Sequence, residues 1–137
     1  IMKEKLMAAL EKSRNYTILV AEAMPEKNYD FKPAEPVWNY KQLMNHLAYC
    51  MKWMEENYVC GTKTEWNPPS DKNNKKETVE YISACFDSLQ KTMNAMSEVK
   101  SETVIAFFSV LEHTAHHRGQ ATTYLRCCNI TPPEYPF

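Results

Sequence analysis

The sequence predicts an all-α protein built as a four-helix bundle, and three observations support this. Glycine occurs at only two of the 137 positions, and no stretch alternates apolar and polar residues as a half-buried strand does. Prolines gather in three segments, at 25–36, 68–69 and 132–136. Since proline interrupts helices and strands alike, these segments separate stretches in which apolar residues recur at helical spacing. We expect a single bundle domain over residues 1–137.

The expected helices run from about Met2 to Met24, Asn39 to Gly61, Lys76 to Glu98 and Thr103 to Asn129. Pro25 ends the first helix, and Asn39 is a good N-cap for the second. The long loops after the first two helices allow crossovers, so the order of the helices stays open. The short turn at about 99–102 predicts that the last two helices are antiparallel neighbours. Residues 130–137 form an extended, proline-rich tail.

Composition narrows the class of protein. The net charge is −1, and lysines and glutamates are interspersed, so no basic surface for nucleic acid or anionic membrane is expected. No apolar run approaches the roughly 18 residues that a membrane span needs. The five cysteines are odd in number and form no CxxC pair, which favours reduced thiols and a cytoplasmic location. We expect a small-molecule substrate.

Three histidines are the candidate metal ligands. His113 and His117 are four residues apart, so they stack on one face of the last helix. His46 falls on the apolar side of the second helix. Three neutral imidazoles with an open fourth position are typical of a catalytic, zinc-like site, and imidazole also suits nickel and copper. The alternative is a core His46 bonded to a carbonyl, with the spacing of the other two a coincidence.

Other residues around this cluster lead to further expectations. A helical wheel turns His116 toward solvent but places Phe108 and Arg118 in the apolar stripe, where Arg118 needs carboxylates or carbonyls at helix or loop ends as partners. Gly119 within the helix indicates close approach of another backbone or subunit. Cys50, one turn beyond His46, is either a fourth ligand or, as the favoured interpretation, a small buried hydrophobe.

The chain resembles the DinB/YfiT-like superfamily of metal-binding four-helix bundles over nearly its whole length. The most specific part is His113-x3-His117-Arg118-Gly119-Gln120, followed by the tail Pro132-Pro133-Glu134-Tyr135-Pro136-Phe137. Asn45-His46-Leu47 matches the position of the family's remaining ligand, and the segments Met24-Pro25-Glu26 and Tyr29-Asp30-Phe31-Lys32-Pro33 are similar to the family's style. All three ligand positions are filled. Cys50 is not part of the family motif.

The resemblance implies a divalent metal, zinc or nickel above all, bound by His46, His113 and His117 with open positions for water. It also implies frequent homodimers. Relatives include S-transferases and isomerases that use bacillithiol, mycothiol or glutathione, with the metal activating the thiol as a thiolate. Others are known only as stress- or damage-induced proteins.

The leading hypothesis is a metal-dependent enzyme of the thiol S-transferase kind, with a low-molecular-weight thiol as co-substrate. Arg118 would anchor the bundle locally, and Gln120 would support a ligand or the local structure. Two alternatives stay open. One is a non-catalytic metal-binding protein of a stress response or an interaction. The other is a metal-dependent hydrolase on the same ligands, for which Tyr49 and Tyr124 are near in helical register. Catalytic residues are not assigned.

Overall fold

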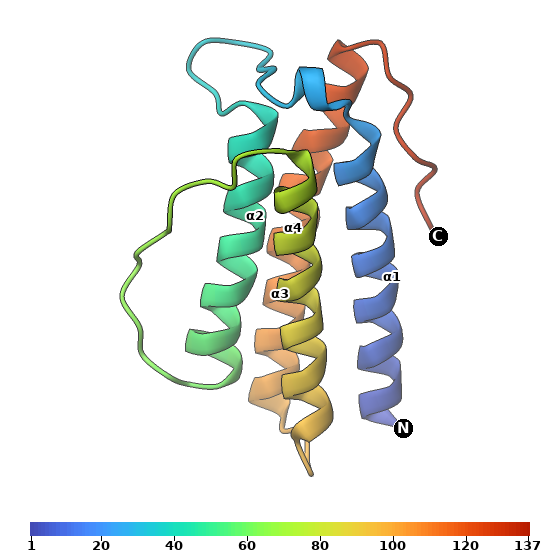
Figure 1. Cartoon of the computed structure of the whole chain (residues 1–137). Helices are drawn as coiled ribbons and strands as arrows, with labels where there is room; N and C mark the ends of the chain where they lie inside the picture. Colours follow the sequence, from blue (N-terminus) through green and yellow to red (C-terminus); the bar gives the residue numbers. More distant parts are fainter.

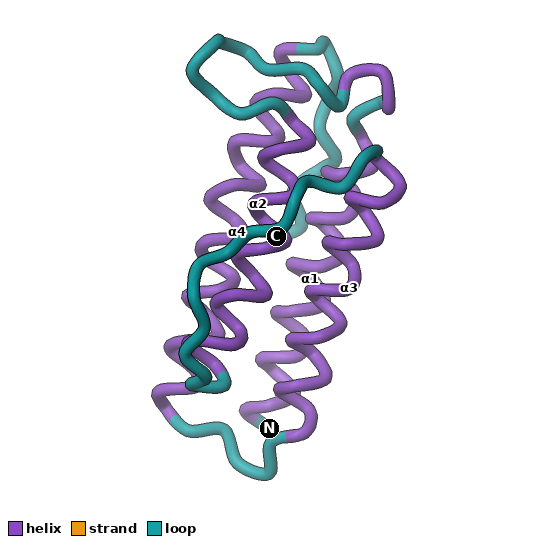
Figure 2. The backbone as a smooth tube through the Cα atoms, turned by 60° about the vertical axis from the view of Figure 1, so that its left-hand side comes forward, coloured by secondary structure: helices purple, strands orange, loops and turns teal.

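Four long helices make up the protein in a computed structural model that describes residues 1–137 (Figure 1). They are α1 (Met2–Ala23), α2 (Tyr40–Met54), α3 (Lys75–Ala95) and α4 (Ser101–Cys127). A 3₁₀ turn, Glu26–Asn28, interrupts the first loop, and α2 continues into a π-helical turn, Glu55–Val59. The protein has no strand, as the tube in Figure 2 shows. The predicted all-α four-helix fold is confirmed.

The helices run in an up, down, down, up order (Figure 1). Residues 60–74 cross back along the outside of the bundle, so α2 and α3 are parallel instead of forming a hairpin. Each of α1 and α2 packs against both α3 and α4. The pairs α1 with α2 and α3 with α4 therefore lie across the diagonals of the bundle.

The prediction that the third and fourth helices are neighbours is wrong, although they are antiparallel. Residues 96–100 join them. An extended chain spans about 3.3–3.6 Å per residue, so this connection reaches beyond the roughly 14 Å diagonal of a bundle whose neighbouring axes lie about 10 Å apart. A short connection thus limits how far apart two helices can lie, but it does not force them to pack against each other.

Local capping fixes where α2 begins. The Asn39 side chain accepts a hydrogen bond from the Gln42 N–H at 2.8 Å, and the Gln42 side chain accepts one from the Asn39 N–H at 2.9 Å. This reciprocal pair satisfies two N–H groups that have no partner inside the helix. Asn39 is therefore the N-cap, as predicted, and the register of α2 is set from that residue.

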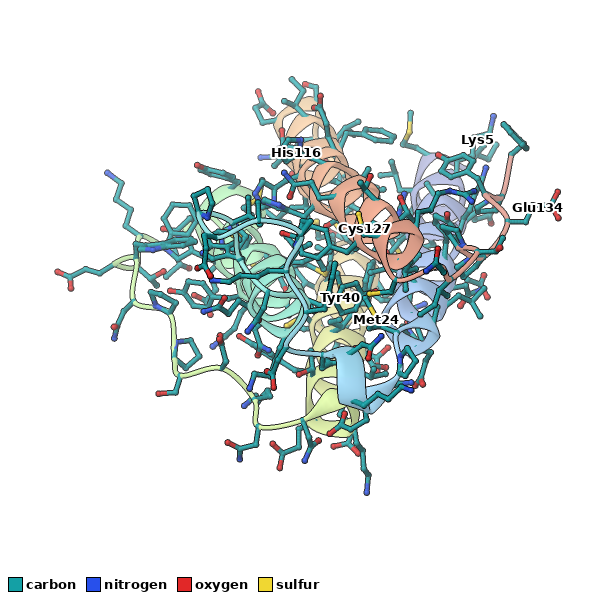
Figure 3. The ribbon with its side chains drawn as sticks, turned by 90° about the horizontal axis from the view of Figure 1, so that it is seen from above. Lys5, Met24, Tyr40, His116, Cys127 and Glu134 are labelled. Carbon is teal, nitrogen blue, oxygen red and sulfur yellow. The ribbon has the colours of Figure 1, made fainter.

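The core lies among all four helices, and the buried Met24 and Tyr40 lie between the helices at the end of the bundle where α1 ends and α2 begins (Figure 3). On α4 the buried face differs from the predicted stripe: Phe108 is 48 % exposed, whereas Val110 and Ala121 are fully buried. Because apolar residues occur on several sides of α4, hydrophobicity alone does not fix its direction. The side facing α1 and α2 is buried, and it keeps Phe107 and Leu125 of the predicted stripe.

Arg118 joins α4 to α1 from a position that is 7 % exposed. Its guanidinium donates to the hydroxyls of Thr17 at 3.0 Å and Ser13 at 3.3 Å, and it lies 4.9 Å from the centre of the Tyr16 ring. Burial lowers the pKa of Arg118 from its usual value. The expected partners at helix or loop ends are not found: hydroxyls and one carbonyl, that of Ser13, within α1 take their place.

The C-terminal tail runs back beside α1 (Figure 1). The Tyr16 hydroxyl donates to the Pro133 carbonyl at 3.2 Å, and the rings of Tyr16 and Tyr135 meet edge to face, 5.3 Å between centres. Tyr16 therefore contacts Arg118 and the tail at once. Gly119 has no such neighbour, because nothing beyond the adjoining turns of α4 lies within 4 Å of the position that a Cβ would take there. The expected close approach of another backbone does not occur within this chain.

None of the four helices is both long and apolar enough to cross a membrane.

Arg118→Ala should lower the free energy of unfolding by about 2–3 kcal/mol, because it removes charge-assisted hydrogen bonds and leaves a cavity. Arg126→Ala is the matched control: Arg126 lies on the exposed side of the same helix, so its loss should cost within about 0.5 kcal/mol. Urea unfolding of both variants checks this. Equal stabilities would show that the contacts of Arg118 with α1 contribute nothing.

Candidate metal centre

The structure brings the three predicted histidines together between α2 and α4. His46 is in the second turn of α2, and His113 and His117 are one turn apart on α4. One ring nitrogen of each lies within 4.8 Å of one from both others. The His46 ring centre is 4.6 Å from that of His117 and 5.8 Å from that of His113. His117 is buried, and the other two are half-buried.

The nitrogen atoms of the two α4 histidines have the spacing of a shared ion. The Nε2 atoms of His113 and His117 are 3.1 Å apart. Two nitrogens bound about 2.1 Å from one ion lie roughly 3.0–3.4 Å apart at ordinary coordination angles. The same spacing fits a hydrogen bond between the rings, so the pair is also satisfied without an ion. The donor set suits a divalent ion that accepts imidazole ligands.

Gln120 sets the tautomer of His117. The Gln120 side-chain oxygen lies 2.8 Å from Nδ1 of His117, so this nitrogen carries the proton and donates it. The lone pair of Nε2 is then free and points toward His113. Metal-binding histidines are commonly oriented in this way by a partner on their other nitrogen. Gln120 thus has the supporting position that the sequence predicts.

All three imidazoles are held in the neutral form. Burial, reinforced by the proximity of His117 and His113, lowers the pKa of His46 to about 4. Burial also lowers the pKa of His113 and of His117, although the bond from Gln120 partly opposes this at His117. Neutral imidazole is the form that binds a metal, so the cluster is ready for one at neutral pH.

His46 has no bond to a carbonyl, contrary to the alternative of a simple core histidine. Its nearest polar neighbour is Cys50, whose Sγ lies 3.3 Å from the Nε2 atom of His46. Cys50 is 4 % exposed, and burial raises the pKa of its thiol to about 11. Cys50 nevertheless lies outside the set of mutually close ligand atoms. His116 is exposed on the outer side of α4, as predicted (Figure 3).

Trp38 lines two pockets beside the histidine cluster. Its ring centre is 4.4 Å from that of His46 and 6.3 Å from that of His117. The Tyr124 hydroxyl donates to the Trp38 carbonyl at 2.7 Å, which ties this loop residue to α4. The side chain of Trp38 is half exposed and lies against the cluster.

The larger pocket, called the His117 pocket, has a volume of about 430 Å³. Its lining consists of Pro36, Val37, Trp38, Leu43, His117, Gln120, Thr123 and Tyr124. The smaller one, called the His46 pocket, has a volume of about 300 Å³. Its lining consists of Trp38, Gln42, Asn45, His46, Tyr49, Trp66, Pro68, Pro69, Ser70, Asp71 and Tyr81. Each pocket thus has one of the three histidines in its wall.

Sequence reasoning missed Trp38 and Trp66 as parts of the site. Trp66 comes from the loop 60–74, and its ring centre lies 6.2 Å from that of His46. A large aromatic residue in an otherwise polar loop was the available signal. Nothing in the spacing of the sequence shows that this loop passes beside α2, because its path depends on the parallel order of α2 and α3.

Burial of a neutral imidazole should make the stability of the metal-free protein depend on pH. Above about pH 6.5 His46 is neutral in both the folded and the unfolded chain; toward pH 4 only the unfolded chain takes up the proton, so stability is lost. We expect the urea midpoint to fall between these pH values, and to fall less in His46→Gln. His116→Gln, at an exposed position, should follow the wild type. Parallel pH profiles for wild type and His46→Gln would contradict this.

The chain matches the family model of the DinB superfamily over residues 9–121. A DinB-like protein from Bacillus cereus has a similar structure, with a TM-score of 0.82 at 12 % identity over 96 % of this chain and 95 % of that one. The DinB-like protein YjoA from Bacillus subtilis has a TM-score of 0.64 at 21 % identity, over 97 % of this chain and 96 % of that one. At these identities the two structures show the fold alone.

No curated protein matches this sequence. The superfamily is metal-binding in general, and the histidine cluster could hold a metal. The match covers most of the chain, and the helical bundle agrees with it. The chain belongs to the DinB superfamily.

Proposed function

We propose that His46, His113 and His117 bind a divalent metal ion, zinc or nickel, and that the protein is a thiol S-transferase dependent on that ion. The observation that carries the proposal is a cluster of three neutral imidazoles, of which His117 lines one pocket and His46 another. Three protein ligands leave a coordination position for a further ligand. A transferase needs room for two substrates, and each pocket offers space beside a different histidine.

The charge of the ligand set supports a thiol. Three neutral imidazoles leave the charge of a divalent ion uncompensated, and no carboxylate belongs to the cluster. An anionic ligand at the remaining position is therefore favoured. When bound, the ion would lower the pKa of a thiol so that it reacts as a thiolate. Bacillithiol, mycothiol and glutathione all carry this group, and the proposed co-substrate is a thiol of that type.

The protein's own residues would arrange this chemistry. Gln120 orients His117 through the Nδ1 hydrogen bond. Trp38 covers the cluster and limits the access of water. Arg118 directly follows His117 in α4 and fixes that helix against α1 through the hydroxyls of Thr17 and Ser13. We assign Arg118 a structural role rather than a contact with substrate.

Two other functions are favoured by specific observations. A hydrolase would use a metal-bound hydroxide and a nearby base, and Tyr49 and Asp71 both line the His46 pocket. A non-catalytic metal-binding protein of a stress response would follow if Cys50 turned from His46 to become the fourth ligand. Thiol-dependent turnover, turnover without thiol, and metal binding without turnover distinguish the three.

We further propose a homodimer in the cytoplasm, without nucleic acid or membrane as partner. The exposed apolar side chains of Ile105 and Phe108 on α4 support self-association, because both lie on one side of the helix. The net charge of −1 supports the absence of a nucleic-acid partner.

The purified protein should contain about one divalent ion per chain by elemental analysis, and it should conjugate a thiol cofactor to an electrophile. Replacing His46, His113 and His117 together by alanine should abolish both properties, since it removes all the ligands. The control is His116→Ala, on the same helix but exposed, which should retain both. A triple variant that keeps its metal and full activity would falsify the proposal.

Gln120→Leu should weaken metal binding about 10- to 100-fold, because His117 loses the partner that fixes its tautomer. Competition with a coloured chelator measures this affinity. Thr123→Val lies in the wall of the same pocket but does not contact a histidine ring, so it should leave the affinity unchanged. Equal affinities for wild type and Gln120→Leu would remove Gln120 from the site.

A further inference from the structure

The His46 pocket is rich in aromatic side chains, although a polar loop forms part of its wall. Four aromatic side chains line it, namely Trp38, Tyr49, Trp66 and Tyr81, together with Pro68 and Pro69. Its volume of about 300 Å³ is at the lower end of the usual range for small-molecule sites. Flat apolar walls of this kind complement a planar ligand.

Trp66 stands at the pocket rather than in the core. Half of its side chain is exposed, and its neighbours in residues 61–71 are exposed as well. Its ring meets that of Tyr49 edge to face at 4.9 Å and that of Trp53 at 5.5 Å. The next residue, Asn67, donates its N–H to the Tyr49 hydroxyl at 2.8 Å. The loop is thus fastened to α2 while half of the tryptophan stays exposed.

The hydroxyl hydrogen of Tyr49 has no acceptor within the protein. Tyr49 is 9 % exposed, and its oxygen accepts from Asn67, but no group of the protein accepts its own hydrogen. Tyr124, beside the other pocket, differs because its hydroxyl donates to the Trp38 carbonyl. Asn45 is also fully used, since it donates to Lys41 and Thr78 and accepts from Lys72. Tyr49 is therefore the buried polar group of this pocket that lacks an acceptor.

The charges near the pocket argue against a cationic ligand, although aromatic walls can bind one. The Lys72 ammonium already lies 4.9 Å from the centre of the Tyr81 ring. Lys41 adds a second positive charge in the neighbourhood: burial raises the pKa of the Asp71 carboxyl, and Lys41 partly opposes that rise. Asp71 alone supplies a negative charge in the lining. A ligand with an oxygen acceptor suits these surroundings better.

We propose that the His46 pocket binds a planar aromatic ring that carries an oxygen acceptor, a carboxylate or a carbonyl. The ring packs against Trp66 and Trp38, which line the pocket and are half exposed, and the oxygen accepts the unused hydrogen of Tyr49. Its role as the second substrate of a thiol transferase rests on the proposed function. The binding itself requires only the side chains of the pocket.

The experiment measures binding of 2-naphthoate to the metal-free protein by calorimetry, so that a carboxylate cannot report on the ion. The saturated counterpart, decahydro-2-naphthoate, has the same charge without the flat ring, and phenyltrimethylammonium has a ring with a positive charge and no acceptor. We expect 2-naphthoate to bind at least fivefold more tightly than either. Tighter binding of the ammonium compound, or equal binding of the saturated acid, would overturn the proposal.

Two pairs of variants locate the binding. Trp66→Leu should weaken binding of 2-naphthoate at least fivefold, whereas Phe137→Leu, at an exposed aromatic residue at the end of the tail, should not change it. Tyr49→Phe should weaken it about tenfold, whereas Tyr58→Phe, at an exposed tyrosine, should not. Circular dichroism confirms that each variant is folded. If the two members of a pair bind equally, the ligand is not in this pocket.

The outcome is separate from that of the metal proposal. If the protein binds no metal but shows the expected naphthoate pattern, the proposal of an aromatic-ligand pocket stands and the transferase proposal fails. If the protein binds metal and conjugates thiols but shows none of these differences for 2-naphthoate, only the proposal of an aromatic-ligand pocket fails.

Discussion

The packing of α2 against α4 is the contact on which the site depends. His46 comes from one helix and His113 and His117 from the other, so the cluster exists only while these helices stay in register. Two devices outside the cluster maintain that register. The cap at Asn39 fixes the start of α2, and Arg118 holds α4 against α1 from the other side. Burial of the rings then depresses the pKa of His46 and keeps the cluster neutral.

The sequence was sufficient for the parts of the fold that local physics determines. Helical spacing, the proline clusters and the N-cap at Asn39 predicted four helices, with ends within a few residues of those observed. It was insufficient where several directions are equally apolar. The side of α4 that holds Phe108 was expected to be buried, yet it is exposed, because the positions of α1 and α2 decide which side is covered.

The same division applies to the site. The i,i+4 spacing of His113 and His117 and the inward position of His46 predicted a cluster that the structure brings together, and whether it binds metal remains a prediction. Trp38 and Trp66 could not be assigned, since both lie in loops: Trp38 in the one before α2, and Trp66 in the one whose path follows from the crossover between α2 and α3. The candidate metal ligands on regular helices could therefore be predicted from the sequence. The loop residues that shape the pockets beside them could not.

The diagonal placement of consecutive helices also affects how the chain can be divided. Neither α1 with α2 nor α3 with α4 forms a packed pair, so each half of the chain has apolar faces that only the other half covers. A cut in the crossover at 60–74 would thus give two fragments that are unstructured separately and fold on mixing. Such complementation would bring His46 to the other two histidines only on reassembly, so the cluster would report that the halves have met.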